Sequence, residues 1–510
     1  MMCAFIIVLV YATVWLVVYT LHLHLVFLFQ SLKAPSYCNI ISDSTSISSR
    51  YYVSTSAPTS VTLKPLFVSE IVLTCMQKKE SIYQRLPFYY GWLVFLATFL
   101  IFMFMYGLRY SVSVFFVPLQ NEFGWSSATT AGTVTVFFWV YGFSALFVGR
   151  LYKRIGVRKI VSLGGLLLGI GGALSSLVKE PWHLYLSWGV LASVGATILY
   201  LIPNVVLARF FLKHRGKAVG WSSMGISVAQ SALVPFTAWI IANYGWRLSF
   251  VVMGTLVIIG VALPGYLIFR ESPESIGLEK DGERLDLDEK GQTVQESSGG
   301  EGWTTKDALR TRSFRCIMAS YFFVVGGTQV MLTFVVPHFV RLGIGPLLAS
   351  TAMGVVGIMS LVGSFAFGFI SDWLGRRRTI AIASGGMAVS MLISTVIPPN
   401  IVWLYAWVAL YGSTYGGAPE QFASIVTDYF GRRDDVGLFA FVHCVGAIGG
   451  GLFPLIGGYL ADVTGSYYAS LTFIGLGMLG AVIAILLAKP VDKPGSLPTE
   501  RAVFPDRASR

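Results

Sequence analysis

An arginine lies deep inside the first strongly apolar run of the chain. Arg109 comes about 18 residues after this run begins, which is roughly 27 Å along a helix at 1.5 Å per residue. A charge in the middle of such a run is costly and needs a reason. Its guanidinium can hold a carboxylate through two parallel hydrogen bonds, so we expect Arg109, with Tyr106 and Tyr110 beside it, to bind a small organic anion. The alternative is an arginine that reaches towards the outer surface or pairs structurally.

A carboxylate and an imidazole lie at similar depth in the second half of the chain. Glu420 follows Pro419 and precedes Gln421, so the helix there is locally weakened and polar. Because burial favours the protonated form of a carboxylate, we expect Glu420 to carry a proton and His443 to relay it. The alternatives are a structural pair with a neighbouring helix for Glu420 and a backbone hydrogen bond for His443. Arg109 and Glu420 differ by about 15 Å in depth, so we do not expect them to pair directly.

Other polar side chains in the apolar runs also suit an anion. Asn204, Gln230 and Gln329 can donate hydrogen bonds to a carboxylate, or can instead tie helices together. His338 and Arg341 end the seventh run, where we expect them to attract anions to an outer vestibule. Helix ends are also where such residues commonly occur without a binding role.

The composition indicates the environment of these residues. The chain has 510 residues, of which 55% are hydrophobic and 12% are charged. This number of charged residues cannot cover that much apolar surface in water. We therefore expect an integral membrane protein, and we expect no nucleic-acid partner. The five cysteines show no metal-binding spacing, and neither a GxxxxGK[ST] nor an HExxH motif occurs. We therefore expect no enzymatic activity and no metal or cofactor.

Twelve apolar runs follow residue 87, each long enough to cross a bilayer as a helix. They are continuous rather than alternating at every second residue, which excludes a β-barrel and predicts an all-α membrane protein of twelve transmembrane helices. The predicted spans are 90–117, 127–149, 159–178, 182–208, 218–243, 248–269, 315–337, 348–371, 379–398, 401–427, 436–460 and 467–488.

Basic residues predict the orientation of these spans. The loops on one side, at 150–159, 209–217, 372–378 and 428–435, hold 14 Lys and Arg, whereas the loops on the opposite side hold 3. Loops rich in Lys and Arg stay in the cytoplasm, so we expect both ends of the twelve-helix unit on the cytoplasmic side. We expect the protein itself to be in the cell (plasma) membrane.

Polar stretches divide the chain into parts. We expect an N-terminal six-helix bundle at 76–269, an acidic cytoplasmic linker at 270–314, a C-terminal six-helix bundle at 315–488 and a cytoplasmic tail at 489–510. Residues 1–75 are atypical, because an apolar stretch occurs there with no Lys or Arg before it. They are either an extra N-terminal helix or an over-extended reading frame, and we favour the second.

Two loops of the chain are similar to each other. Residues 149–159 read Gly-Arg-Leu-Tyr-Lys-Arg-Ile-Gly-Val-Arg-Lys, and residues 368–378 read Gly-Phe-Ile-Ser-Asp-Trp-Leu-Gly-Arg-Arg-Arg. The offset of 219 residues indicates two similar halves, in which glycines let helix ends approach while a carboxylate and arginines clamp neighbouring helices. The residues expected to form this conformational gate are Gly149, Arg154, Gly156, Gly368, Asp372, Gly375, Arg376 and Arg377.

These loops resemble the signature of the major facilitator superfamily, G-x-x-x-D-x-x-G-R-[KR]-[RK]. The second copy matches fully, whereas the first has Lys153 in place of the aspartate. The resemblance covers about residues 88–488. It implies two six-helix bundles that rock about a central site, which is lined by the first helix and opens to one side of the membrane at a time.

Shorter stretches are similar to prokaryotic members of the monocarboxylate transporter family and to the oxalate:formate antiporter family. They are Tyr90-Gly-Trp92, residues 111–119, 122–126 and 209–220, and Asp428-Tyr-Phe-Gly431. Animal monocarboxylate carriers have an Asp and an Arg four residues apart in the eighth helix. This chain has Ser360 and Ser364 at the matching places, so the mechanism of the animal carriers does not carry over.

The sequence therefore predicts a secondary transporter of a small organic anion, with monocarboxylates as the implied class. Alternating access, coupled to protons or to exchange, would move the anion across the bilayer. Two alternatives stay open: a carrier of the same fold for a drug or a sugar, and a transporter-like receptor that binds without translocation.

Overall fold

The computed structural model describes residues 88–211, 215–276, 278, 302–398, 400–431 and 435–491, except for the side chains at 215–217, 419–420 and 435–436. The atypical segment 1–75, much of the linker 270–314 and most of the tail 489–510 lie outside these residues. What the sequence predicts for those parts stays a prediction.

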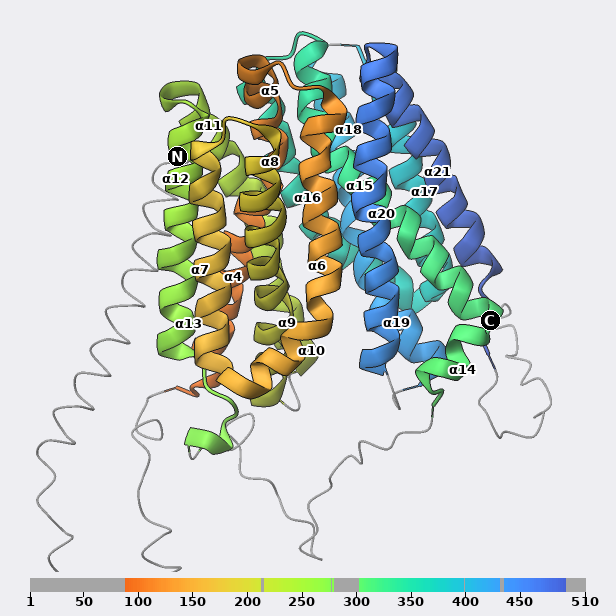
Figure 1. Cartoon of the computed structure of the whole chain (residues 1–510). Helices are drawn as coiled ribbons and strands as arrows, with labels where there is room; N and C mark the ends of the chain where they lie inside the picture. Colours follow the sequence, from red (N-terminus) through yellow and green to blue (C-terminus); the bar gives the residue numbers. More distant parts are fainter. Residues whose placement is uncertain are drawn as a thin grey trace, which may run out of the picture.

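A first bundle is built from the helices between Gly91 and Ile268, coloured orange to green in Figure 1. They are α4 (Gly91–Tyr110), α5 (Val112–Phe123), α6 (Ser127–Ile155), α7 (Val157–Leu174), α8 (Pro181–Leu184), α9 (Ser193–Phe210), α10 (Arg215–Val228), α11 (Val234–Tyr244), α12 (Trp246–Val257) and α13 (Leu263–Ile268). Three π-helical turns, Tyr185–Ala192, Ala229–Leu233 and Ile258–Ala262, join some of these helices into longer spans.

A second bundle, green to blue in Figure 1, contains the remaining helices. They are α14 (Thr305–Arg310), α15 (Arg312–Arg341), α16 (Pro346–Leu374), α17 (Arg376–Ser394), α18 (Ile401–Gly417), α19 (Pro419–Phe430), α20 (Asp435–Thr464) and α21 (Tyr467–Leu487). The helix α14 lies inside the predicted linker. It is preceded by Trp303, whose backbone N–H donates to the carbonyl of Phe430 over 2.8 Å.

Ten stretches of the described residues are long and apolar enough to cross a membrane. The helix α17 falls short because it begins with three arginines, and α18 falls short because it has 17 residues before the chain continues into α19. With α17 and the α18–α19 pair, the described chain has twelve spans. The predicted all-α fold of two six-helix bundles is thus confirmed.

The helices α6 and α20 pack along each other where the two bundles meet (Figure 1). A methyl group added at Gly451 would lie 2.7 Å from the Trp139 ring, and one added at Gly458 would lie 2.7 Å from the carbonyl oxygen of Ser127. The Thr135 hydroxyl donates to the carbonyl of Gly451 over 2.8 Å. Small residues let the two backbones come this close, as is common between helices packed in lipid.

Asp462 of α20 holds the start of α6. Its two carboxylate oxygens accept the backbone N–H groups of Ser127 (2.7 Å) and Ala128 (2.8 Å). N–H groups in the first turn of a helix have no partner within the helix, and a negative charge is favourable there. We call the end of the molecule that holds Ser127 and Asp462 the outer end.

The two similar glycine-containing loops lie at the opposite end, which we call the basic end. Gly149 is 22 residues beyond Ser127 on α6, or about 33 Å along the helix. A methyl group added at Gly149 or at Gly368 of α16 would meet no atom within 4 Å. The neighbouring side chains of Phe147 and Phe369 are exposed. The bundles are therefore joined at the outer end, while these two glycines have no neighbour at the basic end.

The role of Asp462 can be tested by removing its carboxylate. Asp462→Ala leaves two N–H groups at the start of α6 without their partner, and a hydrogen bond to a charged group contributes about 1.5–3 kcal/mol. We expect the Tm of the purified protein to fall by several degrees. Asp372→Ala is the control, because Asp372 is exposed and pairs with no described side chain. An equal fall in both variants would contradict the role given to Asp462.

Candidate functional site

Arg109 lies in the last turn of α4, and aromatic rings surround its guanidinium. Its Cζ atom is 4.7 Å from the ring centre of Phe138, 5.2 Å from those of Tyr106 and Tyr141, and 5.5 Å from that of Phe137. Tyr106 comes from α4 itself, and the other three rings come from α6. The face of an aromatic ring carries partial negative charge, so each ring attracts the cation.

None of the described carboxylates neutralises Arg109. Glu122 pairs with Arg247 (2.7 Å) and Asp428 pairs with Arg376 (2.6 Å). The Nε atom of Arg109 is buried and has no hydrogen-bond partner. The rings contribute about 0.5–2 kcal/mol each as cation–π contacts. They stabilise the positive charge but leave Nε free to donate to an anion.

The helix α20 brings His443 to the same cluster from the second bundle. The His443 ring stacks on Tyr200, with 5.4 Å between ring centres and 11° between planes, and lies 5.7 Å from Tyr141. Tyr321 and Phe439 complete its surroundings. Both imidazole nitrogens are buried and have no hydrogen-bond partner. Tyr141 therefore contacts both Arg109 and His443, whose free polar atoms come from different bundles.

A hydrogen bond joins the two bundles directly beside Arg109. The hydroxyl groups of Tyr110 on α4 and Tyr415 on α18 are 2.9 Å apart. Tyr415 stacks on Tyr411, which in turn stacks on Trp407, so a column of rings along α18 holds this phenol. Side chains of both bundles thus meet around Arg109. We call this set the Arg109 cluster: Tyr106, Arg109, Tyr110, Phe137, Phe138, Tyr141, Tyr200, Tyr321, Tyr415 and His443.

The three predicted amide donors occupy different places. Asn204 is one turn from Tyr200 on α9: its Nδ2 donates to the Tyr200 carbonyl (3.0 Å), and its Oδ1 is buried without a partner. Gln230 is buried in a π-helical turn, with Nε2 unpartnered, and packs against Gly357 of the second bundle. Gln329 is buried on α15, eight residues or about 12 Å beyond Tyr321. Asn204 is the amide beside the Arg109 cluster.

The structure does not bring His338 and Arg341 to this cluster. His338 lies 17 residues beyond Tyr321 on α15, which is about 25 Å along the helix. It is buried, and its Nε2 hydrogen-bonds to the carbonyl of Ser394 (3.0 Å). Arg341 lies 4.3 Å from the ring centre of Tyr467. Both residues have partners near the outer end, and their part in an anion-attracting vestibule stays a prediction.

Glu420 is the second residue of α19, and its side chain is outside the described ones. The next residue, Gln421, is buried, and its Oε1 accepts hydrogen bonds from Ser371 (3.0 Å) and Arg376 (3.1 Å). The start of α19 is therefore tied to the second glycine-containing loop. The proton-carrying role of Glu420 stays a prediction.

The two glycine-containing loops share a backbone geometry. Gly156 has φ +77° and Gly375 has φ +81°, and each ends one helix and begins the next. A side chain strains this conformation, which explains the glycine in both copies. The equivalent turns support the internal repeat.

The charges of the two loops differ. In the second copy, Arg376 pairs with Asp428 at 2.6 Å, and Arg377 donates to the carbonyl of Ala488 at 3.3 Å. Asp372, and Lys153 and Arg154 of the first copy, are exposed. In the second copy, the charged contact at the basic end is thus an ion pair within the second bundle.

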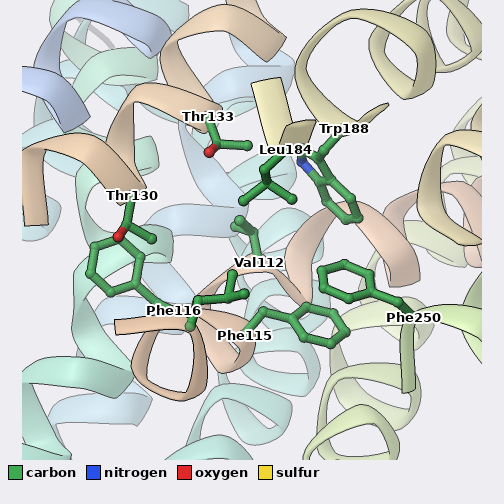
Figure 2. Close-up of a pocket in the computed structure, with 9 residues that line it drawn as sticks. Val112, Phe115, Phe116, Thr130, Thr133, Leu184, Trp188 and Phe250 are labelled. Carbon is green, nitrogen blue, oxygen red and sulfur yellow. The ribbon is translucent and has the colours of Figure 1, made fainter. Parts of the chain in front are cut away.

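A small cavity in the first bundle is a separate feature (Figure 2). Its volume is about 10 Å³, close to the lower limit for one water molecule. Apolar side chains and the hydroxyl groups of two threonines line it: Val112, Phe115, Phe116, Leu119, Thr130, Thr133, Leu184, Trp188 and Phe250. It is too small for an organic anion and does not include Arg109. Nor do the described residues contain a group of three or more His, Cys, Asp or Glu that could hold a metal ion.

Three tyrosines of the cluster were not predicted from the sequence: Tyr141, Tyr200 and Tyr321. They lie in the interior of their spans, not at the ends where aromatic residues collect at membrane surfaces. A tyrosine in the interior of a span indicates a polar contact there, because its buried hydroxyl group needs a hydrogen-bond partner. Its proximity to Arg109 is not readable from the chain, since the three tyrosines come from α6, α9 and α15.

Comparison with known proteins gives matches along most of the chain. The sequence profile of the Major Facilitator Superfamily matches residues 94–433 and 341–508, which confirms the resemblance found in the loops. Monocarboxylate transporter 13 of Bos taurus is 27% identical over 81% of this chain and 94% of that protein. Monocarboxylate transporter 12 of Homo sapiens is 22% identical, over 79% of this chain and 81% of that protein.

Solved structures share the fold. A D-xylose-proton symporter superposes with a TM-score of 0.62 and 16% identity, over 79% of this chain and 98% of the symporter. A bacterial homolog of the human lysosomal transporter Spinster, in an inward-facing and occupied conformation, gives a TM-score of 0.60 and 19% identity, over 78% of this chain and 96% of that chain. Identities this low support the architecture alone.

Because both nitrogens of His443 lack a partner, we expect that replacing this histidine by an apolar ring stabilises the protein. His443→Phe keeps a ring on Tyr200 and removes two buried polar atoms, each of which costs about 1–3 kcal/mol when unpaired. We therefore expect its Tm to rise. His338→Phe is the control: it leaves the Ser394 carbonyl without its donor, so its Tm should fall. A lowered Tm for His443→Phe would show that these nitrogens have stabilising partners.

Proposed function

Because the chain belongs to the Major Facilitator Superfamily, we propose that it moves a monocarboxylate-like organic anion across the membrane by alternating access. It is a multi-pass integral membrane transporter related to the monocarboxylate transporters. The substrate, the coupling and the direction of opening are parts of the proposal.

One observation carries the choice of an anion. Arg109 places a positive charge within the first span, four aromatic rings surround it, and no described carboxylate pairs with it. A guanidinium binds a carboxylate through parallel hydrogen bonds and is more weakly hydrated than an ammonium group. An anion that enters the site would supply the missing negative charge and accept a hydrogen bond from Nε.

The arrangement of the bundles supports alternating access. We place the basic end in the cytoplasm because its loops are rich in Lys and Arg. The contacts of Asp462 then close the extracellular side, and the motif glycines without neighbours lie on the cytoplasmic side. This is the arrangement of an inward-facing transporter. In the opposite state, the contacts of Asp462 would open and the glycines would meet the other bundle.

Proton coupling is the second part of the proposal. Glu420 is our candidate proton carrier, and the unpartnered nitrogens of His443 suit a relay near Arg109. A neutral imidazole has one nitrogen that donates and one that accepts a hydrogen bond, which suits it to a relay. Exchange of one anion for another is the alternative mode for the same site.

Uptake of labelled anions tests the proposed function. Purified protein in liposomes would be given lactate, pyruvate, formate or oxalate, with and without an inside-alkaline pH gradient, and with unlabelled anion inside to allow exchange. We expect accumulation of at least one monocarboxylate, driven by the gradient or by exchange. No uptake of any of the four by folded protein would contradict the monocarboxylate assignment.

Arg109→Gln should weaken the site without unfolding the protein. The substitution keeps a hydrogen-bond donor but removes the charge, and a charge-assisted hydrogen bond contributes about 1.5–3 kcal/mol. We expect the affinity for a transported anion to fall roughly 10- to 100-fold while the protein still inserts into the membrane. Arg312→Gln is the matched control, because Arg312 is exposed at the start of α15 and should leave affinity nearly unchanged. Retained affinity in Arg109→Gln would remove Arg109 from the site.

Gly149→Val should block transport without blocking binding. In this state a Cβ at Gly149 meets no atom within 4 Å, so the side chain is tolerated here. Closure of the basic end would bring the other bundle against it. Gly345→Val, at the outer start of α16, also meets no atom within 4 Å and is the control. We expect Gly149→Val to bind anions with normal affinity but to lose uptake into liposomes. The control Gly345→Val should keep both binding and uptake. Normal uptake by Gly149→Val would mean that α6 does not close at this glycine.

A further inference from the structure

The rings around Arg109 would contact the uncharged part of a bound anion, whereas Arg109 would contact its carboxylate. The rings of Phe137, Phe138 and Tyr141 on α6 lie within 5.5 Å of the guanidinium carbon. Tyr141 is 6.1 Å from Tyr200 on α9, measured between ring centres. A molecule held at Arg109 by its carboxylate therefore has ring faces and ring edges as its neighbours on the side of the first bundle.

The same aromatic surface continues into the second bundle. His443 stacks on Tyr200, and its ring centre lies 6.4 Å from that of Tyr321 on α15. Tyr321 in turn contacts Phe422 of α19, with 4.8 Å between ring centres. We call the set Tyr141, Tyr200, Tyr321 and His443 the aromatic wall. It joins four helices of both bundles, and the phenol and imidazole groups supply its polar atoms.

The charge count limits the substrate to one negative charge. Among the described residues, Arg109 is the one Lys or Arg in the interior of a span, since the others lie within two turns of a span end or in loops. A second carboxylate would lie against the aromatic wall without a cation, at a high desolvation cost. While His443 is neutral, the polar atoms of the wall can hydrogen-bond a neutral substituent but cannot neutralise a second charge.

We propose that the site selects monocarboxylates whose body is a planar aromatic ring, and that the aromatic wall is what selects them. This inference rests on the proposed function and adds the class of substrate. Aromatic rings attract one another in edge-to-face and offset-stacked arrangements beyond the burial of their surface. A saturated ring of the same size buries similar area but lacks the quadrupole. The wall therefore distinguishes two anions that Arg109 alone would bind equally.

Benzoate and cyclohexanecarboxylate are the matched probes, because they share one carboxylate and a six-membered carbon ring. Equilibrium binding of each labelled anion to the purified full-length protein would be measured together with that of lactate. We expect benzoate to bind about tenfold more tightly than cyclohexanecarboxylate, a difference of about 1.4 kcal/mol. Tyr141→Leu should abolish this preference and Tyr141→Phe should keep it. The control Tyr459→Leu, at an exposed tyrosine of α20, should change nothing.

The outcomes separate this inference from the function on which it rests. Equal affinity for the two ring acids, or tighter binding of lactate than of benzoate, overturns the aromatic selectivity and leaves monocarboxylate binding intact. The comparison uses the unaltered protein, so it decides the question even if Tyr141→Leu does not fold. Binding of none of the three anions overturns the proposed function, and the inference with it.

Discussion

An unneutralised guanidinium within a membrane span is the constraint on which the rest of this molecule depends. Arg109 is placed in the first span without a described carboxylate partner, and the rings of Tyr106, Phe137, Phe138 and Tyr141 take the place of a counter-ion. Ring quadrupoles attract a cation, but they accept hydrogen bonds poorly and leave Nε unpartnered. The rings therefore stabilise the empty site, and in the proposed function Nε stays available to an anion. A paired aspartate would have stabilised the arginine more strongly and removed its reason to bind a ligand.

The helix that carries Arg109 is also joined to the second bundle by a hydrogen bond. Arg109 belongs to α4, and its neighbour Tyr110 is hydrogen-bonded to Tyr415 of α18. In the proposed function, an anion on Arg109 would lie at the interface between the two bundles, where its binding would favour one packing over another. At the outer end this packing is specific, because the Asp462 carboxylate holds the first turn of α6. At the basic end, glycines without a neighbour leave α6 and α16 able to approach the other bundle.

Much of this architecture could be predicted from the sequence, because lipid imposes simple rules on length and charge. Twelve continuous apolar runs predicted the twelve spans that the described chain has. The lone arginine inside the first run, with Tyr106 and Tyr110 beside it, is the centre of our candidate site, and its role in binding stays a prediction. The partners of Arg109 could not be predicted, since Tyr141 and His443 reach it from helices far away in sequence. The vestibule role of His338 stays a prediction, and its buried hydrogen bond to the Ser394 carbonyl depends on packing that no local pattern reveals. The π-helical turns and α14 were not predicted, although Thr304, which caps the start of α14 through the Asp307 N–H, is a local signal for that helix.

The most direct test of the proposed anion site is a structure determined with a transported monocarboxylate bound. We expect the carboxylate to lie within hydrogen-bond distance of the Arg109 guanidinium, between the two bundles. The result that would contradict it is a bound anion elsewhere in the molecule, with the Arg109 guanidinium paired to a carboxylate of the protein.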